Sequence, residues 1–241
     1  MTSTVQLSDG IDGLLSLTPG SAALVLSDLP SGATRAEFDV PADLQRLWPA
    51  IWQALKPSGI AVLMASSLRF AAQVLAVGQI HFRHDLIWSK SLATGHLNAS
   101  RAPLRAHEYI LVFSRETGTY NPQMLTGASP IHAARRMCGQ GENYNAAKQG
   151  TCSRAGATDR YPTSVLEFAS VGTSSVSRVH PQQKPVPLLR WLIRTYSNTG
   201  DLVVDPYAGS GSTGEAAQME ERLFLGFDTS PRFASLGAST G

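Results

Sequence analysis

A stretch late in the 241-residue chain combines an acidic residue with a glycine-rich turn. Leu202-Val203-Val204 is a short β-branched apolar run, typical of a buried parallel strand, and Asp205 follows it directly. Gly209, Gly211 and Gly214 allow a tight turn and a close approach of the backbone to a ligand. A strand, a glycine turn and a helix form the usual nucleotide-cofactor crevice at the carboxyl edge of an α/β sheet. The stretch therefore predicts a cofactor site.

The same glycines satisfy the dinucleotide pattern G-x-G-x-x-G, so a nicotinamide cofactor is one alternative. Two features disfavour it. Asp205 would repel a pyrophosphate and suits a cationic amino-acid tail better. Asp228 ends the next apolar run, where it can hold ribose hydroxyls, but the tail after it is too short for the further βα units of a dinucleotide domain.

A second acidic residue ends another apolar run near the amino terminus. Residues 22–27 are typical of a buried strand, and Asp28-Leu29-Pro30-Ser31 follows them. An aspartate at such a place is most often a turn or helix cap. Together with the cofactor turn, however, Asp28 becomes a candidate catalytic carboxylate.

The Asp-x-Pro tetrad and the distant Asp-Pro-Tyr-Ala-Gly-Ser-Gly segment resemble the β group of DNA amino-methyltransferases, in which the catalytic tetrad precedes the cofactor turn. Further segments resemble phage and prophage members in the same order: 5–10, 87–90, 94–99, 105–113 and 180–185. The resemblance implies S-adenosylmethionine as cofactor and DNA, with a flipped target base, as partner. The target is an exocyclic amine, and a tetrad that begins with Asp favours adenine N6 over cytosine N4.

The tetrad residues can activate an amine that is a poor nucleophile, because its lone pair is delocalised into the base. Asp28 and the carbonyl of Pro30 can accept its two protons and free the lone pair to attack the sulfonium methyl. Ser31 stands where the family usually has an aromatic ring that stacks on the base, a contact worth about 1–3 kcal/mol. A DNA-binding protein with weakened catalysis is therefore an alternative, unless another ring, such as Trp88, substitutes.

The resemblance also assigns cofactor contacts. Asp205 is expected to bind the methionine ammonium, directly or through water, and Asp228 the ribose. The other expected contacts are Tyr207, Gly209 and Gly211 in the turn, Phe227 against the adenine, Asp9 from the neighbouring strand and Lys184 beside the methionine end. For Lys184 a surface position is an equal alternative. Thr213 is expected only to cap the following helix.

The elements that must position these residues alternate between strand and helix patterns. Strands are predicted at 60–64, 85–88 and 109–113, and helices at 44–55, 70–77, 185–196 and 215–221. This alternation predicts an α/β protein with a mostly parallel sheet. With the resemblance, we expect a Rossmann-like S-adenosylmethionine-dependent methyltransferase fold: one domain over residues 1–241, with a seven-strand sheet in permuted order.

Residues from about 117 to 163 lack periodicity and are rich in Gly, Asn, Gln and Ser. So long a stretch inside a compact domain is usually functional or disordered. We expect a target-recognition insertion, and the alternative is a solvated surface excursion. The candidate DNA contacts are Arg135, Arg136, Arg154 and Arg160.

The composition of the chain limits the classes of protein to which it can belong. A net charge of +2 and a pI near 8.6 would not by themselves indicate a nucleic-acid binder. Cys138 and Cys152 form no C-x-x-C pair, so we expect neither a disulfide framework nor a metal site. Without a signal peptide or an apolar run of about 18 residues, no membrane segment and a cytoplasmic location are expected. Relatives often dimerise, so a homodimer is a further expectation, although no self-complementary stripe is visible.

Overall fold

The computed structural model describes residues 3–33, 39–127, 129, 156–172 and 183–231. The chain divides into two units, Met1–Asn121 with Ser164–Gly241, and Pro122–Thr163. The second unit lies within the expected insertion, and its described residues include an antiparallel bridge between Leu125 and Arg160. A part in DNA recognition remains a prediction for this unit.

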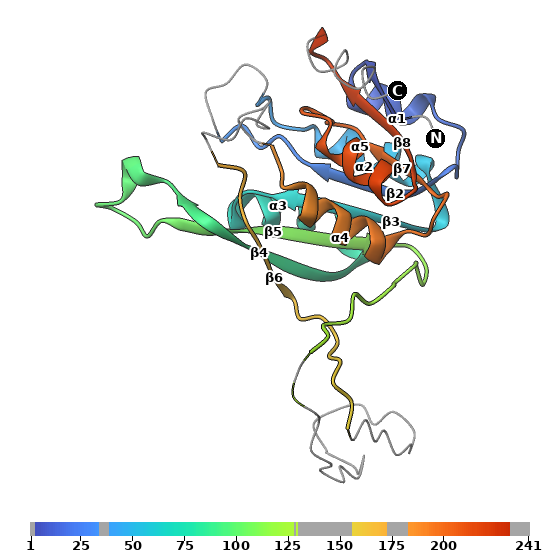
Figure 1. Ribbon diagram of the computed structural model, residues 1–241. Helices are drawn as coiled ribbons and strands as arrows, with labels where there is room; N and C mark the ends of the chain where they lie inside the picture. The colour runs from blue at the N-terminus through green and yellow to red at the C-terminus, as the bar shows by residue number, and fades with distance from the viewer. Residues whose placement is uncertain (1–2, 34–38, 128, 130–155, 173–182, 232–241) are drawn as a thin grey trace. The chain divides into compact units, whose positions relative to one another are not determined.

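The first unit is built on an eight-stranded sheet with the order β1-β8-β7-β2-β3-β5-β4-β6 (Figure 1). The strands are β1 Ser3–Leu7, β2 Ala22–Asp28, β3 Leu55–Ala65, β4 Phe82–Thr94, β5 Arg105–Ser114, β6 Val165–Phe168, β7 Leu202–Asp205 and β8 Leu223–Asp228. β5 runs antiparallel to both neighbours, and the other pairs are parallel. The mostly parallel, permuted sheet is confirmed. It has one strand more than expected, because the short β6 adds to the edge beside β4.

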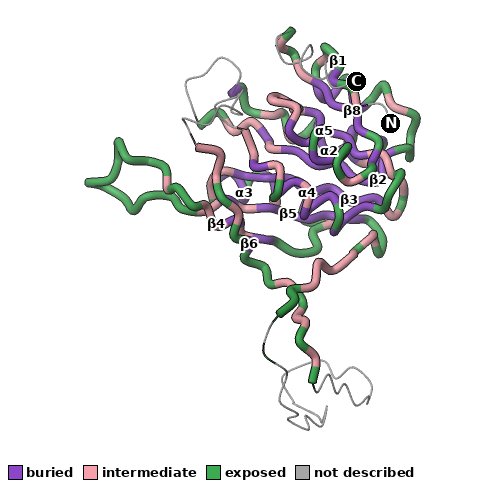
Figure 2. Tube along the Cα trace, in the orientation of Figure 1, coloured by how far each residue is buried: buried purple, intermediate pink, exposed green. Residues whose placement is uncertain are grey.

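Helices cover both faces of the sheet: α1 Gly10–Ser16, α2 Leu44–Ala54, α3 Leu68–Gly78, α4 Val186–Tyr196 and α5 Ser212–Met219. Side chains alternate between the two faces, so Leu24 and Leu26 join the core under α4 and α5 while Val25 joins the core under α1, α2 and α3. The strands between these layers are therefore buried along most of their length (Figure 2). Such burial explains the continuous apolar runs in the sequence.

Strand pairing brings the two acidic segments together. β7 lies between β2 and β8, with Val25 beside Val204 and Asp205 beside Gly226. Because β2, β7 and β8 are parallel, Asp28, Asp205 and Asp228 all end strands at one carboxyl edge. This edge is where open α/β sheets bind ligands.

Candidate functional site

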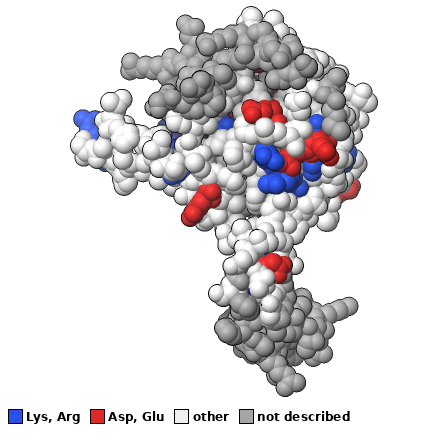
Figure 3. Space-filling model, in the orientation of Figure 1, with Lys and Arg blue, Asp and Glu red and all other residues white. Residues whose placement is uncertain are grey.

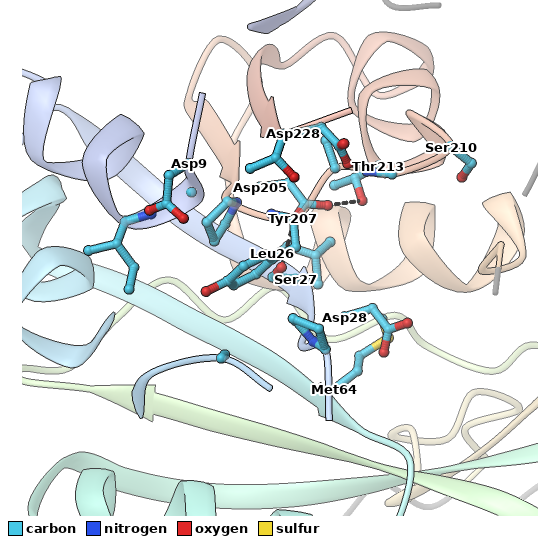
Figure 4. Close-up of a pocket in the computed structure, with 18 of the residues that line it drawn as sticks. Asp9, Leu26, Ser27, Asp28, Met64, Asp205, Tyr207, Ser210, Thr213 and Asp228 are labelled. Carbon is cyan, nitrogen blue, oxygen red and sulfur yellow. Dashed lines mark hydrogen bonds between the residues drawn. The ribbon is translucent and has the colours of Figure 1, made fainter. Parts of the chain in front are cut away.

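A cavity of about 450 Å³ opens at this carboxyl edge, a size that suits a small organic ligand (Figure 4). Its lining comes from the ends of β2, β7 and β8, from the start of α1, and from the segment before α2. The predicted residues that line it are Asp9, Asp28, Pro30, Lys184, Asp205, Tyr207, Gly209 and Asp228. The catalytic and the cofactor candidates thus share one cavity.

Asp205 is buried at the end of β7 and is held by three neutral donors. Its Oδ1 accepts hydrogen bonds from the Ser27 hydroxyl at 2.7 Å and the Tyr207 amide at 3.0 Å. Its Oδ2 accepts one from the Thr213 hydroxyl at 2.7 Å, drawn dashed in Figure 4. Burial raises the pKa of Asp205 to about 6, although these donors oppose the rise. Thr213 therefore does not cap α5, because Gly211 occupies the N-cap position.

The glycine turn is tied to Asp228. Gly209 and Gly211 have φ angles of 48° and 77°, which other residues rarely adopt. The Gly209 amide donates to Asp228 Oδ2 at 3.0 Å, and the Ser230 amide donates to Oδ1 at 2.7 Å. Gly209 lines the cavity together with Ser210, whereas Gly211 is outside the lining and acts through its backbone conformation alone.

Asp9 and Phe227 differ in how they meet expectation. Asp9 lines the cavity while its Oδ1 caps α1, accepting from the Ile11 amide at 2.9 Å and the Asp12 amide at 3.2 Å. Phe227 is fully buried in the core and is absent from the lining. A Cβ on Gly13 of α1 would lie 2.4 Å from the Phe227 ring, so the ring fills the space beneath α1. The contact expected between Phe227 and the adenine stays a prediction, and the residues that do line the cavity include Ile11 and the aromatic Tyr207.

Asp28 is paired with a lysine that comes from a distant part of the chain. Lys184 Nζ lies 2.7 Å from Asp28 Oδ2 and 3.1 Å from Glu108 Oε2. Lys90 Nζ lies 3.3 Å from Glu108 Oε1. The Lys184 side chain is only 11% exposed, so Lys184 is part of a buried ion-pair network and not a surface residue.

Burial and charge act in opposite directions on this network. Burial raises the pKa of Asp28, assisted by the nearby Glu108, and Lys184 only partly offsets the rise. Burial also raises the pKa of Glu108, but Lys184 and Lys90 outweigh it and the net pKa is lowered. Burial would lower the pKa of Lys184, yet the two carboxylates raise it, so the ammonium stays charged. Glu108 thus fixes the cation that faces Asp28.

The rest of the tetrad is held by backbone contacts. The Pro30 carbonyl accepts the Ala42 amide at 3.1 Å, which leaves one of its two lone pairs for a ligand. The Ser31 amide donates to Asp39 Oδ1 at 3.0 Å, and the Ser31 hydroxyl lies 3.3 Å from that of Ser66. Ser31 is not among the residues that line the cavity.

Trp88 does not take the place of the missing ring in this structure. It is 3% exposed within the core, and its Nε1 donates to the Phe168 carbonyl at 2.9 Å. Lys184 Nζ lies 5.9 Å from its ring centroid. Trp88 therefore forms part of the wall behind the ion-pair network and is not presented to a base.

The predicted DNA contacts lie in the second unit. Arg135, Arg136 and Arg154 fall outside the described residues. The guanidinium of Arg160 donates to the backbone carbonyls of Ala157 and Asp159, each at 3.0 Å. The structure thus assigns Arg160 a local bracing role in its own loop.

The described ranges contain neither a cluster of metal ligands nor a helix long enough to span a membrane. Within them, no group of three His, Cys, Asp or Glu residues could hold a metal ion. No helix in the same ranges has the length and apolar character needed to cross a membrane.

Solved structures define the class of this fold. The M1.HpyAVI–SAM complex matches with a TM-score of 0.61 and 16% identity, over 98% of this chain and 96% of that one. The cytosine-N4-specific PvuII DNA methyltransferase matches with a TM-score of 0.68 and 17% identity, over 99% and 86%. The fold is that of the S-adenosylmethionine-dependent methyltransferases.

Sequence comparison then gives the family. A family model described as DNA methylase, covering N6 and N4 enzymes, matches residues 41–239, and the chain belongs to this family. It is 43% identical over 58 residues to the DNA adenine methyltransferase YhdJ of Escherichia coli, a match covering 24% of this chain. It is 27% identical over 159 residues, or 66% of this chain, to the type II methyltransferase M.XycI of Xanthomonas campestris. The matches span 20% and 43% of the lengths of these two relatives.

Proposed function

We propose that the protein transfers a methyl group from S-adenosylmethionine to the N6 amine of adenine in DNA. The observation that carries the proposal is that Asp28 and Asp205 line the same cavity, one at the end of β2 and the other at the end of β7. A methyl donor held by the second would lie beside an amine held by the first. The family match supports DNA as the substrate.

The cofactor end of the cavity suits the groups of S-adenosylmethionine. Asp205 is a buried carboxylate whose hydrogen-bond donors among the described residues are all neutral, so it can receive the methionine ammonium. Asp228 and Asp9 also line the cavity, and their carboxylates can accept hydrogen bonds from ribose hydroxyls. Tyr207 supplies an aromatic surface in the same cavity.

The residues at the other end suit an exocyclic amine. Asp28 and the remaining lone pair of the Pro30 carbonyl can each accept one amine proton, which localises the lone pair on nitrogen. The nitrogen attacks the sulfonium methyl, the N–C bond forms as the C–S bond breaks, and the electron pair leaves on sulfur as a neutral thioether. The methylated amine then loses one proton, for which Asp28 is the adjacent acceptor. Lys184 holds Oδ2 of Asp28, which leaves Oδ1 to face the amine.

Nucleoside mass spectrometry tests this proposal most directly. Unmethylated DNA incubated with the protein and S-adenosylmethionine should yield N6-methyladenine, and the product should disappear with Asp28→Ala. N4-methylcytosine in its place would keep the chemistry and overturn the choice of base. Both amines present the same geometry to Asp28, and the tetrad's Asp together with the match to an adenine methyltransferase supports adenine.

Ser31 supports a second candidate, a DNA-binding protein with weak catalysis. Because Ser31 has no ring and Trp88 is buried in the core, the base would lose a stacking contact of about 1–3 kcal/mol unless another ring replaced it. Ser31→Tyr should then raise kcat/KM about tenfold or more. An unchanged rate would show that the base is held by other groups and would remove the reason for this candidate.

A further inference from the structure

A two-stranded ribbon, residues 91–107, continues past the end of the sheet, and we call it the edge hairpin. The last pair between β3 and β5 joins Ala65 to Tyr109, and the last between β4 and β6 joins Lys90 to Phe168. Beyond these positions β4 and β5 pair only with each other. The edge hairpin is the green projection on the left of Figures 1 and 2.

The edge hairpin begins at the catalytic edge. Since β5 is antiparallel to β3, its first residues lie where β3 and its parallel neighbour β2 end. Arg105 Nη1 donates to the Ser66 carbonyl at 3.2 Å, and the Ser66 hydroxyl lies 3.3 Å from that of Ser31. A duplex that delivers a base to Asp28 would therefore pass close to the hairpin.

The side chains of the edge hairpin combine apolar and cationic groups. Leu92, Leu97 and Leu104 are 56%, 101% and 38% exposed, and Arg101 and Arg105 are exposed as well. Residues 91–107 contain no Asp or Glu. In Figure 3 the hairpin accordingly shows blue atoms and no red ones. Cations attract phosphates, and exposed leucines next to them suit a partner with both a charged backbone and an apolar stack.

The tip of the edge hairpin forms a short hydrogen-bonded turn, although its residues are exposed. Gly95 has a φ of 95°, which turns the chain into a short 3-10 helix, His96–Asn98. The amides of Asn98 and Ala99 donate to the carbonyls of Gly95 and His96 at 2.9 and 3.2 Å. Leu97 thus lies in a turn that backbone hydrogen bonds hold together.

We infer that the edge hairpin is a DNA-contacting element that inserts Leu97 into the base stack beside the extruded target, with Arg101 on a neighbouring phosphate. The inference rests on the proposed function. Extruding a base leaves a gap in the stack, and apolar wedges from other proteins stabilise unstacked steps in this way. The element is separate from Pro122–Thr163, the unit that the sequence suggests for target recognition.

The test compares two duplexes built on a site mapped by methylation with the wild-type protein. One duplex is fully paired, and in the other the target base lies opposite an abasic position, so extrusion is easier. Leu97→Ser should lower kcat/KM about 10- to 100-fold on the paired duplex. On the duplex with the abasic position, kcat/KM should stay within about twofold of the wild-type value. Arg101→Gln should reduce the magnitude of the slope of log affinity against log salt by about one, as expected when one phosphate contact is lost.

Ile80→Ser is the matched control. Ile80 is 83% exposed and precedes β4, at the end of the strands opposite the carboxyl edge. Its change should therefore leave both rates unaltered. Equal rates for Leu97→Ser and wild type, or equal losses on both duplexes, would overturn the inference. A shift of Leu97→Ser from dimer to monomer in sedimentation would also overturn it, because the hairpin would then join two copies of the chain. If the wild-type protein methylates no DNA at the mapping step, the proposed function itself fails and the inference falls with it.

Discussion

The cavity holds two carboxylates in different surroundings: Asp205 is buried, whereas the side chain of Asp28 is 23% exposed. Asp205 is surrounded by two hydroxyls and an amide, whereas Asp28 faces the ammonium of Lys184. A buried carboxylate that lacks a cation is suited to take one from its ligand, as the methionine ammonium would provide. A carboxylate that already has its cation can accept a hydrogen bond from a neutral amine without needing a charged partner. We therefore expect Asp205 to face the cofactor and Asp28 to face the base.

The first prediction removes each carboxylate in turn, and we expect the largest effect here. Asp28→Ala should lower the rate of methyl transfer at least about 10²- to 10³-fold and leave the Kd for S-adenosylmethionine within about threefold. Asp205→Ala should instead raise that Kd by at least about tenfold, because the ammonium loses its carboxylate. Calorimetric titration and single-turnover kinetics separate the two quantities. Similar losses of binding in both variants would contradict the division of labour.

The second prediction concerns the cation at the base end. Lys184→Met would leave the partly buried Asp28 without its cation and Glu108 with Lys90 alone, and it should lower the free energy of unfolding at pH 7 by about 3 kcal/mol. The deficit should shrink as the pH falls, because protonation removes the unpaired charges. Urea denaturation measures it, with Lys56→Met as the control. Lys56 pairs with Asp201 at a more exposed site and should cost about 0–1 kcal/mol.

The third prediction concerns the pH dependence of cofactor binding. Asp205 has a pKa of about 6, so the Kd for S-adenosylmethionine should rise by up to about tenfold per pH unit as the pH falls below 6. In Asp205→Asn the Kd should be weak and should lose this dependence. Calorimetry from pH 5 to 8 measures both. The same carboxyl affects stability in the opposite sense: its folded-state pKa exceeds the ordinary 3.8, so its contribution is greatest below that pH and is lost as the pH rises through about 6.

The smallest effect should come from a single neutral donor. Thr213→Val keeps the shape of the side chain and removes one hydrogen bond to Asp205, which should weaken cofactor binding by about 1 kcal/mol, or several-fold. It should also shift the pH dependence of binding upward. Thr195→Val is the control, because it makes the same change at a buried threonine whose hydroxyl bonds to the Trp191 carbonyl at 2.7 Å and which does not line the cavity. Equal effects of the two variants would show that the Thr213 contact does not tune the carboxylate.

Local sequence was enough to predict a ligand-sized site at the end of β7, because its strand, turn and helix are consecutive. Asp205, Gly209 and Asp228 all lie where the pattern of apolar run and glycine turn indicated. Phe227 lies outside the lining of the cavity for a reason that the sequence does not reveal. β8 is buried on both faces, so its apolar run does not show which side chains point to the cavity edge and which to the core.

The base end depends on contacts that no local pattern reveals. Asp28 could be predicted only by resemblance, and its pairing with Lys184 joins residues far apart in the chain. A lysine at the start of a helix is usually solvated, which is why a surface position was an equal alternative. Glu108, directly before the apolar run 109–113, was the available signal, since a buried acid needs a cation nearby. The extent of β4 and β5 was also underestimated, because the exposed ribbon beyond the sheet lacks an apolar period.

The strand order also bears on how the chain is made. Among the described strands, β1 pairs only with β8, so Ser3 has no strand partner until Phe224 has been synthesised. Likewise, β2 lacks its neighbour β7 until residue 205 has been synthesised. During translation the parts that hold the base would emerge well before those that hold the methyl donor. The edge of β2 stays unpaired for most of that time and is exposed to wrong partners. A nascent chain stalled before β7 should therefore depend on chaperones, and cofactor added during synthesis should aid folding only in the last step.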